Sequence, residues 1–359
     1  MKLGIVGLPF SGKTTVFNCL TGANEPLSDF SGGGETKIRV VDVPDPRLER
    51  LRQDYKPKKY SPAKVELHDL PGYGGSERYF GQVRDLDAIV RVVRAFSSSS
   101  VMHPKNRKID WKADASDLEA DFLIQDLAMI EKRIEKLEKS SKKPSKTQKE
   151  EIEELALLLK LKPTLDANRP LREATISADE RVKISGFQFL TLKSTLTLVN
   201  MGDDDDPVKL GIPPLPKLET GVAPPNDITV GIRARLESEV SQLDAADREA
   251  FLKDFGITET IRDLVVRLAY ALLDQMSFLT AGEKEVRAWT IQRGAPAIEA
   301  ARKIHSDIAK GFARAQVIGW SDYVAHGGEK GAKEANKMRA EGRDYVMQDG
   351  DLVEFLHSG

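Results

Sequence analysis

A stretch near the N-terminus has the residue types and the spacing needed to hold phosphate groups. The run Gly7-Leu8-Pro9-Phe10-Ser11-Gly12-Lys13-Thr14 fits the pattern G-x-x-x-x-G-K-[ST]. In such a loop, successive backbone N–H groups point inward at an anion. The Lys13 ammonium would reach the β- and γ-phosphates, and the Thr14 hydroxyl would bind Mg²⁺. The sequence therefore predicts a binding site for a nucleoside triphosphate.

The elements around this loop are those that such a site requires. The apolar run Leu3-Gly4-Ile5-Val6 predicts a buried strand, and residues 16–20 predict a helix. A helix that starts at the loop presents its positive end to the same anion. Further apolar runs at 64–69 and 88–95 alternate with helical or loop segments, which indicates a parallel sheet.

Two more motifs follow expected strands. Asp69-Leu70-Pro71-Gly72 is a weak pattern alone, but it follows the loop at the distance expected of a GTPase-like domain. Asp69 would hold Mg²⁺ through water, and the Gly72 N–H would meet the γ-phosphate. Asn200-Met201-Gly202-Asp203 is similar to N-K-x-D, in which the Asp accepts two hydrogen bonds from guanine and the Asn braces the loop. A plain strand-end turn, which Asn, Gly and Asp also favour, is the alternative.

A charged helical hairpin interrupts the α/β pattern. Apolar residues recur at helical spacing on both sides of a break at 140–145. Between Lys132 and Lys149 there are eight Lys or Arg residues and two Glu residues. This basic segment is either a solvated tip or a contact for RNA or another polyanion.

The remaining segments complete a three-part organisation. Strands are expected at 187–199, 228–232, 286–294, 313–320 and 344–356, and helices at 245–254, 258–274 and 295–312. Strands crossed by one helix near the C-terminus indicate a small β-grasp-like domain. The expected domains are a discontinuous nucleotide-binding domain, a helical hairpin and a C-terminal domain, at residues 1–112 with 166–275, 113–165 and 276–359, respectively.

Composition narrows the protein class further. A chain of 359 residues favours two or three domains. The net charge of −2 argues against a globally basic nucleic-acid binder but leaves room for a local basic patch. Cys19 is the single cysteine, so no internal disulfide can form, which suits a reducing cytosol. No apolar run has the length of a membrane span, and the early core strand leaves no room for a signal peptide, so we expect a cytoplasmic protein.

Several stretches together resemble one family. They are "GLPFSGKTT", "PDPRLERL", "DLPGYGG", "DLAMIEKRIEKLEK", "NMGD", "TAGEKEVRAWTIQRG" and "EGRDYVMQDGDLVEF". Over essentially its whole length, the chain resembles the YchF-type Obg-like ATPases of the translation-factor-related GTPase class. The resemblance implies a P-loop domain with an inserted coiled-coil hairpin and a C-terminal TGS domain. It also implies slow hydrolysis of ATP or GTP and association with ribosomes.

The chain departs from that family at positions that matter. Phe10 stands where the family usually has an Asn that helps to hold potassium, and Tyr73 stands where Ras-like enzymes have a water-orienting Gln. We therefore expect slow hydrolysis with little potassium stimulation. The first switch is altered to "FSGGGETKIRV", in which Thr36 is the nearest candidate Mg²⁺ ligand. Asp203 replaces the family's usual Glu, which favours a modest preference for GTP with ATP still bound.

The sequence thus predicts an α/β P-loop GTPase-like domain with an inserted helical hairpin and a C-terminal β-grasp (TGS) domain. Its expected function is that of a switch protein that cycles between GTP and GDP or ATP and ADP, with Mg²⁺ as cofactor and the ribosome or RNA as partner through the hairpin and the TGS domain. The alternatives are a nucleotide-binding scaffold with negligible hydrolysis and an RNA-binding module with a structural nucleotide. The expected nucleotide-binding residues are Phe10, Ser11, Gly12, Lys13, Thr14, Thr15, Asn200, Met201, Asp203 and Ala234; the catalytic candidates are Lys13 and Gly72; the Mg²⁺ candidates are Thr14, Asp69 and Thr36.

Overall fold

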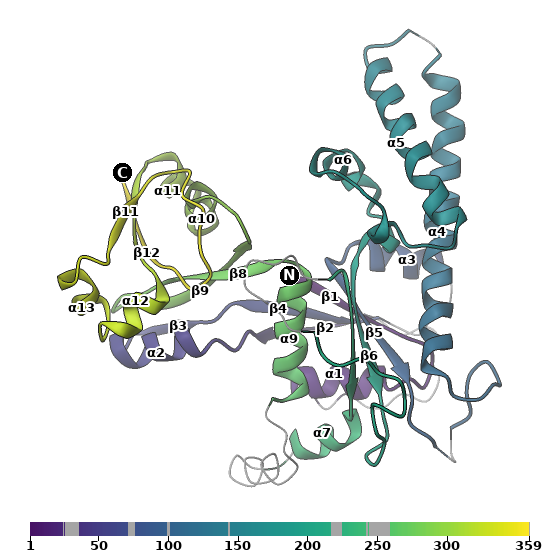
Figure 1. Ribbon diagram of the computed structural model, residues 1–359, viewed down its shortest axis with the longest axis horizontal. Helices are drawn as coiled ribbons and strands as arrows, with labels where there is room; N and C mark the ends of the chain where they lie inside the picture. Colours follow the sequence, from purple (N-terminus) through teal and green to yellow (C-terminus); the bar gives the residue numbers. More distant parts are fainter. Residues whose placement is uncertain are drawn as a thin grey trace. The chain divides into compact units, whose positions relative to one another are not determined.

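The computed structural model divides the chain into two compact units (Figure 1). Unit 1 comprises residues 1–39, 66–217 and 225–262, and unit 2 comprises residues 40–65 and 263–359 together with a short connecting segment. The structure describes residues 1–23, 25, 36–70, 76–98, 101–142, 144–216, 225–241, 243 and 259–358. Within these residues, no helix combines the length and the apolar character needed to cross a membrane.

The first sheet has six strands in the order β2-β4-β1-β5-β6-β7. Their bounds are β1 Lys2–Val6, β2 Lys37–Asp42, β4 Lys64–Asp69, β5 Ala88–Arg94, β6 Ser194–Asn200 and β7 Asp227–Ile232. β1 pairs in parallel with β4 and β5, and the parallel pairing continues from β5 through β6 to β7. The carboxyl ends of these strands therefore meet at one edge, which is where open parallel sheets bind ligands.

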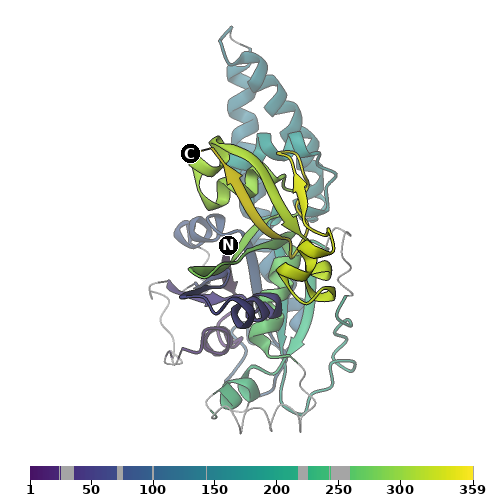
Figure 2. The same ribbon diagram turned by 90° about the vertical axis from the view of Figure 1, so that its left-hand side faces the viewer.

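Helices of unit 1 flank this sheet and extend beyond it. The shorter ones are α1 Lys13–Thr21, α3 Glu77–Arg84, α6 Ala178–Ile184 and α7 Ala234–Ser241. α4 Trp111–Ser140 and α5 Gln148–Asp166 form the predicted hairpin, which projects from the sheet in both views (Figures 1 and 2). Ile130, Leu137, Leu158 and Leu161 belong to one buried cluster along its seam, because their helical spacing places them on facing sides.

The second sheet also has six strands, in the order β11-β10-β12-β8-β9-β3. Their bounds are β3 Lys59–Ser61, β8 Gln275–Thr280, β9 Glu285–Gln292, β10 Phe312–Ile318, β11 Arg339–Glu341 and β12 Leu352–His357. The associated helices are α2 Pro46–Tyr55, α10 Ala297–Ile304, α11 Ser306–Lys310, α12 Trp320–Ala325 and α13 Glu329–Glu334, and α9 Ile261–Leu272 precedes β8.

The structure groups residues 40–65 with the C-terminal part of the chain, whereas the sequence placed them in the nucleotide-binding domain. β3 pairs in parallel with β9, and Leu48 and Leu51 of α2 are fully buried in a cluster with Leu279 and Val286. The local pattern of α2 predicts an amphipathic helix but does not say which sheet it covers. The C-terminal unit therefore includes a helix and a strand from a distant part of the sequence.

Three secondary-structure predictions need adjustment, and one is the strand expected over 344–356, which begins only at Leu352 as β12. The strand expected from residue 187 begins at Ser194, because residues 185–192 form short 3-10 turns. The helix expected over 295–312 is broken at His305, whose backbone is extended, into α10 and α11. The helix expected at 258–274 is present as α9, and the one expected at 245–254 lies outside the described residues.

Candidate nucleotide-binding site

The phosphate loop lies between β1 and α1, and one glycine makes its geometry possible. Gly12 caps α1 with φ 91° and ψ 20°, a left-handed conformation that favours glycine. A Cβ atom at this position would lie 2.3 Å from the side-chain nitrogen of Asn200. Gly12 therefore allows both the turn into the helix and the close approach of a side chain from β6.

Lys13 lies inside the loop and bonds to its carbonyl groups. Its Nζ donates to the carbonyl oxygen of Gly7 at 2.8 Å and to that of Leu8 at 3.3 Å. Burial lowers the pKa of the Lys13 ammonium to about 8, and the nearby Asp69 carboxylate opposes this shift. The loop thus holds a poorly solvated cation. The attraction between such a cation and an anionic ligand is stronger than it would be in water.

The three candidate Mg²⁺ ligands have different surroundings. Asp69 ends β4 and is 8% exposed; burial raises the pKa of its carboxyl, and the ammonium groups of Lys13 and Lys37 oppose that rise. The Thr36 hydroxyl is buried and has no hydrogen-bond partner among the described residues. Thr14 lies in the first turn of α1. Hydroxyls, one carboxylate and phosphate oxygens match the oxygen ligands that Mg²⁺ takes in nucleotide sites.

Other residues predicted on this side fall outside the described part of the chain. Gly72, Tyr73 and the glycines at 32–34 are among them. Among the described residues, His, Cys, Asp and Glu side chains form no group of three or more that could hold a metal ion. An Mg²⁺ ion here would depend on threonine hydroxyls, Asp69 and the nucleotide itself.

Asn200 connects the phosphate loop to the end of β7. Its Nδ2 donates to the carbonyl oxygen of Ser11 at 3.1 Å, and its Oδ1 accepts from the Ala234 N–H at 3.3 Å. The Cys19 thiol contacts the Ala234 carbonyl at 3.2 Å, and burial raises the pKa of that thiol to about 12. Asn200 is 5% exposed, so a buried amide fixes the spacing between the loop and the strand beside it.

The other residues of the expected base motif have contrasting environments. Met201 is 4% exposed and packs in an apolar cluster with Leu8 and Val199, so its side chain is part of the core. Asp203 is exposed, and its backbone carbonyl accepts a hydrogen bond from the Arg233 guanidinium at 3.0 Å. Its carboxylate is therefore the group of this motif that a base could reach.

Phe10 and Phe96 also border the loop. Phe10 has φ 62°, a conformation that is rare for a bulky side chain. The Phe96 ring lies 3.9 Å from the position of a Cβ on Gly12, and its backbone N–H donates to the Asn200 carbonyl at 3.1 Å. The Arg94 guanidinium lies 4.7 Å from the Phe96 ring centroid. Phe96 was not among the predicted site residues; the signal was an aromatic residue shortly after a buried strand.

A buried ion pair joins the segment after the Asp69 motif to the hairpin. Asp126 of α4 is fully buried and accepts from Arg84 of α3 at 3.1 Å. It also accepts from the backbone N–H groups of Leu190 and Thr191, at 3.1 and 2.8 Å. Next to it, Phe80 of α3 meets Phe122 of α4 edge to face. The helix that follows the Asp69 motif therefore packs directly on the base of the hairpin.

A second network holds the same hairpin to the sheet. Glu119 of α4 accepts both guanidinium nitrogens of Arg172 at 2.8 Å and one of Arg91 at 3.2 Å. Both arginines also approach Asp227 at the start of β7. Since Glu119 pairs with two largely buried arginines, this network ties the base of the hairpin to the sheet.

The hairpin tip, by contrast, is an exposed basic surface. Five of its lysines make no ion pair with any described residue: Lys132, Lys136, Lys142, Lys146 and Lys149. We call this set the tip lysines. Such a group attracts polyanions through its summed field rather than through any single contact.

A parallel sheet, a phosphate loop after β1 and an amide brace from β6 define a nucleotide-binding protein of the P-loop GTPase-like class. Sequence comparison agrees: the model of a family described as a 50S ribosome-binding GTPase matches residues 2–125, and that of YchF-GTPase_C, described as a protein of unknown function, matches residues 275–358. The chain belongs to the YchF family, because a relative of that name is 37% identical over 99% of its length.

Relatives of that family align with almost the whole chain. The ribosome-binding ATPase YchF of Escherichia coli O157:H7 is 37% identical, with 99% of this chain and 98% of the relative covered. The protein of the same name from Bacillus subtilis is 34% identical with the same coverage. The structure of the Schizosaccharomyces pombe YchF GTPase superimposes with a TM-score of 0.83 at 27% identity, over 99% of this chain and 97% of that one.

Proposed function

We propose that this protein is a nucleoside triphosphate hydrolase whose nucleotide state controls its association with the ribosome. The observation that carries the proposal is the phosphate-binding cradle: a partly buried lysine inside a loop that Asn200 holds against the end of β7. The names of the relatives, ribosome-binding ATPases, support both the hydrolysis and the partner.

Each residue of the cradle has a role in this proposal. The loop N–H groups and the Lys13 ammonium bind the β- and γ-phosphates, while Thr14, Asp69 and Thr36 would hold Mg²⁺. Mg²⁺ supplies charge neutralisation at the phosphate oxygens when bound. Hydrolysis is slow, because Phe10 offers no oxygen to a monovalent cation and Tyr73 has no carboxamide to orient water.

A change in the bound nucleotide would affect the hairpin through α3. The Asp69 motif precedes α3 directly, and α3 is bonded to the hairpin through Arg84 and Asp126. A γ-phosphate contact at this motif would therefore act on α3 and, through Arg84 and Asp126, on the base of the hairpin that carries the tip lysines.

Two measurements test the proposal. Single-turnover hydrolysis of ATP and GTP, with and without ribosomes, should give a slow rate that Lys13→Ala removes. Co-sedimentation with ribosomes should differ between triphosphate, diphosphate and no nucleotide. No hydrolysis above the uncatalysed rate would favour the scaffold alternative, and sedimentation independent of nucleotide would contradict the switch.

A further inference from the structure

The side of α5 that faces away from the hairpin core carries a stripe of apolar residues. The buried residues of this helix belong to the core that it shares with α4: Leu157, Leu158, Leu161 and Leu165. Helical spacing places four exposed apolar residues on the opposite side: Ile152, Ala156, Leu159 and Pro163. We call these four residues the outer stripe. Ile152 and Leu159 are 51% and 48% exposed, and α5 is the one helix in the described part of the chain with two large apolar side chains so exposed.

Opposite charges lie at the two ends of the outer stripe. Lys149 precedes it by three residues and Asp166 follows it by three, so both lie on the same side of the helix. Lys149 makes no ion pair with a described residue, and Asp166 pairs with Lys162 at the surface. From Lys149 to Asp166 the steps are three, four, three, four and three residues, which is the same order in both directions. Such a face is complementary to a second copy of itself that runs the opposite way.

Antiparallel packing of two copies of α5 covers the whole stripe in one register. Ile152 lies beside Pro163 of the second copy, and Ala156 lies beside Leu159 of the second copy. Each end then brings Lys149 of one copy next to Asp166 of the other. Parallel packing would place like charges together at both ends, so the charges favour the antiparallel orientation.

The same register joins opposite charges along one edge of the stripe. Glu153 and Lys160 lie on the edge next to α6, where each is 2.7 Å from a residue of that helix, Lys183 and Glu180, respectively. In the antiparallel pair Glu153 comes next to Lys160 of the second copy. The charges then alternate in sign across the two copies. This complementarity points to a second copy rather than to a helix of unrelated sequence.

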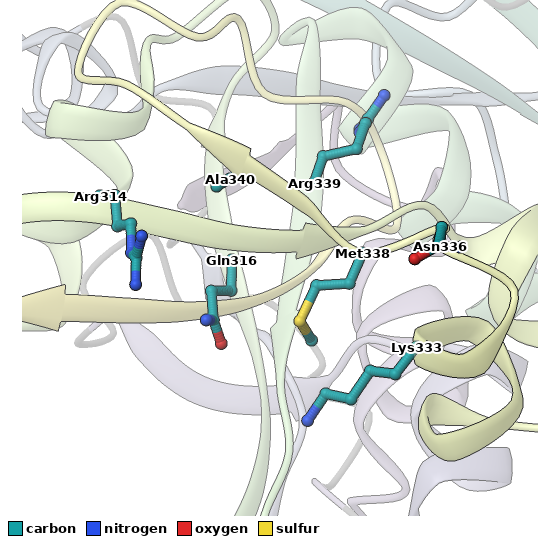
Figure 3. Close-up of a pocket in the computed structure, with 7 residues that line it drawn as sticks. All are labelled: Arg314, Gln316, Lys333, Asn336, Met338, Arg339 and Ala340. Atoms are coloured by element: carbon teal, nitrogen blue, oxygen red, sulfur yellow. The ribbon is translucent and has the colours of Figure 1, made fainter.

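The pocket of about 280 Å³ on unit 2 offers no comparable apolar surface (Figure 3). Met338 is its one large apolar lining residue, among side chains that are mainly polar or charged. Exposed apolar residues that stand singly on other helices, such as Val324 of α12, are normal on protein surfaces. The outer stripe differs from these because its apolar residues are continuous and its charges are ordered.

We propose that the outer stripe is the interface of a homodimer in which two hairpins pack antiparallel along α5. A pair of helices of 19 residues buries less than about 1,200 Å², which is the range of weak and transient interfaces. The dimer is therefore reversible and forms at micromolar or higher concentration. It goes beyond the proposed function, because it requires neither the cradle nor a ribosome.

Sedimentation equilibrium of the full-length protein across the micromolar range tests the proposal. Wild type should show a reversible equilibrium between monomer and dimer. Ile152→Gln/Leu159→Gln removes two apolar side chains from each copy's interface and should raise the dissociation constant about 100-fold or more. Both positions are exposed in the monomer, so the variant should keep its fold. A wild-type protein that remains monomeric throughout would overturn the homodimer and leave the outer stripe to a helix of another protein.

A matched control removes two equally exposed apolar side chains from unit 2. Val324 and Val346 are 57% and 49% exposed. Val324→Gln/Val346→Gln should leave the dissociation constant close to that of wild type. Equal losses in the two double variants would show that surface hydrophobicity acts without a defined interface, and they would overturn the assignment to the outer stripe.

Charge reversal tests the orientation of the two helices. Lys149→Glu places a carboxylate beside Asp166 of the second copy, and Asp166→Lys places an ammonium beside Lys149 of the second copy. Each single variant should therefore weaken dimerisation about tenfold, and Lys149→Glu/Asp166→Lys should restore it. In a parallel pair each single variant would only exchange one like-charge contact for another. Single variants that dimerise as wild type does, or a double variant that is not restored, would overturn the antiparallel interface.

Discussion

Lysines occupy two opposite settings in unit 1, the cradle and the hairpin tip. Lys13 is enclosed by the loop, bonds to two of its carbonyl groups and has a lowered pKa. The tip lysines are exposed and make no ion pair with a described residue. A buried cation interacts strongly with a single ligand, whereas exposed cations are screened and act by number. The same residue type therefore serves as a specific contact in one region and as part of a field in the other.

The largest expected effect concerns Lys13, the lysine that makes a specific contact. Lys13→Ala removes charge-assisted hydrogen bonds to two phosphates, which costs roughly 3–6 kcal/mol, or about 150-fold or more in triphosphate affinity. Calorimetric titration with ATP and GTP measures the loss. Removing a desolvated charge opens no apolar cavity, so thermal stability should stay within about 1 kcal/mol of wild type.

The matched control is Lys136→Ala at the tip, which should leave nucleotide affinity unchanged. Nucleotide affinity of Lys13→Ala equal to that of wild type would remove the cradle from the mechanism.

The second prediction concerns the ion pair that joins the two regions. Asp126→Asn leaves the Arg84 guanidinium without its carboxylate and turns an amide NH₂ toward the N–H groups of Leu190 and Thr191. Breaking such a buried pair costs roughly 3–5 kcal/mol in the free energy of unfolding. Chemical denaturation measures it.

Glu135→Gln on the same helix removes a carboxylate that pairs with Lys139 in solvent, and it should leave the free energy of unfolding close to that of wild type. Similar losses in both variants would mean that the base of the hairpin is no more tightly coupled than its tip.

The third prediction uses pH to separate the two settings. Triphosphate binding requires charged Lys13, whose pKa in the free protein is lowered to about 8. The charged fraction therefore falls as pH rises through 8, and affinity should drop about tenfold between pH 7 and pH 9. Lys13→Ala should show a flat profile over this window. A wild-type profile that is also flat would show that nucleotide binds independently of the protonation of Lys13.

The fourth prediction concerns the part of the site that would contact the nucleotide base. Asp203 is exposed and follows Asn200, which bonds to the phosphate loop, and a carboxylate there can accept from guanine N1–H and N2–H₂. Adenine presents a lone pair at N1 instead. Asp203→Glu should therefore shift the ratio of GTP to ATP affinity toward ATP by about tenfold, from the loss of one well-placed charged hydrogen bond. An unchanged ratio in parallel titrations would disconnect Asp203 from the base.

Local signals explain what the sequence could predict. The strand, loop and helix around Lys13 are contiguous, and so are the apolar stripes of the hairpin, and both were predicted correctly. The sequence assigned residues 40–65 to the nucleotide-binding domain, whereas in the structure Tyr60 pairs with Val286 far along the chain, and no local pattern encodes such a pairing. Met201 aligns with a base-motif position, but its burial depends on packing against Leu8 and Val199, which no local pattern encodes. Phe96 was missed for the same reason.

The smallest expected effect concerns the backbone of the cradle. Phe10 has φ 62°, and a left-handed conformation costs a residue with a Cβ roughly 1–2 kcal/mol relative to its favoured regions. Asn tolerates this conformation, because its short polar side chain bonds locally to the backbone. Phe10→Asn should therefore raise the free energy of unfolding by about 0.5–1 kcal/mol. Phe10→Ala keeps the Cβ and its backbone cost, so the difference between the two variants in chemical denaturation isolates the conformational term. An Asn variant no more stable than the Ala variant would show that Phe10 is held there without strain, and that the rigidity of the cradle comes from Gly12 and Asn200 alone.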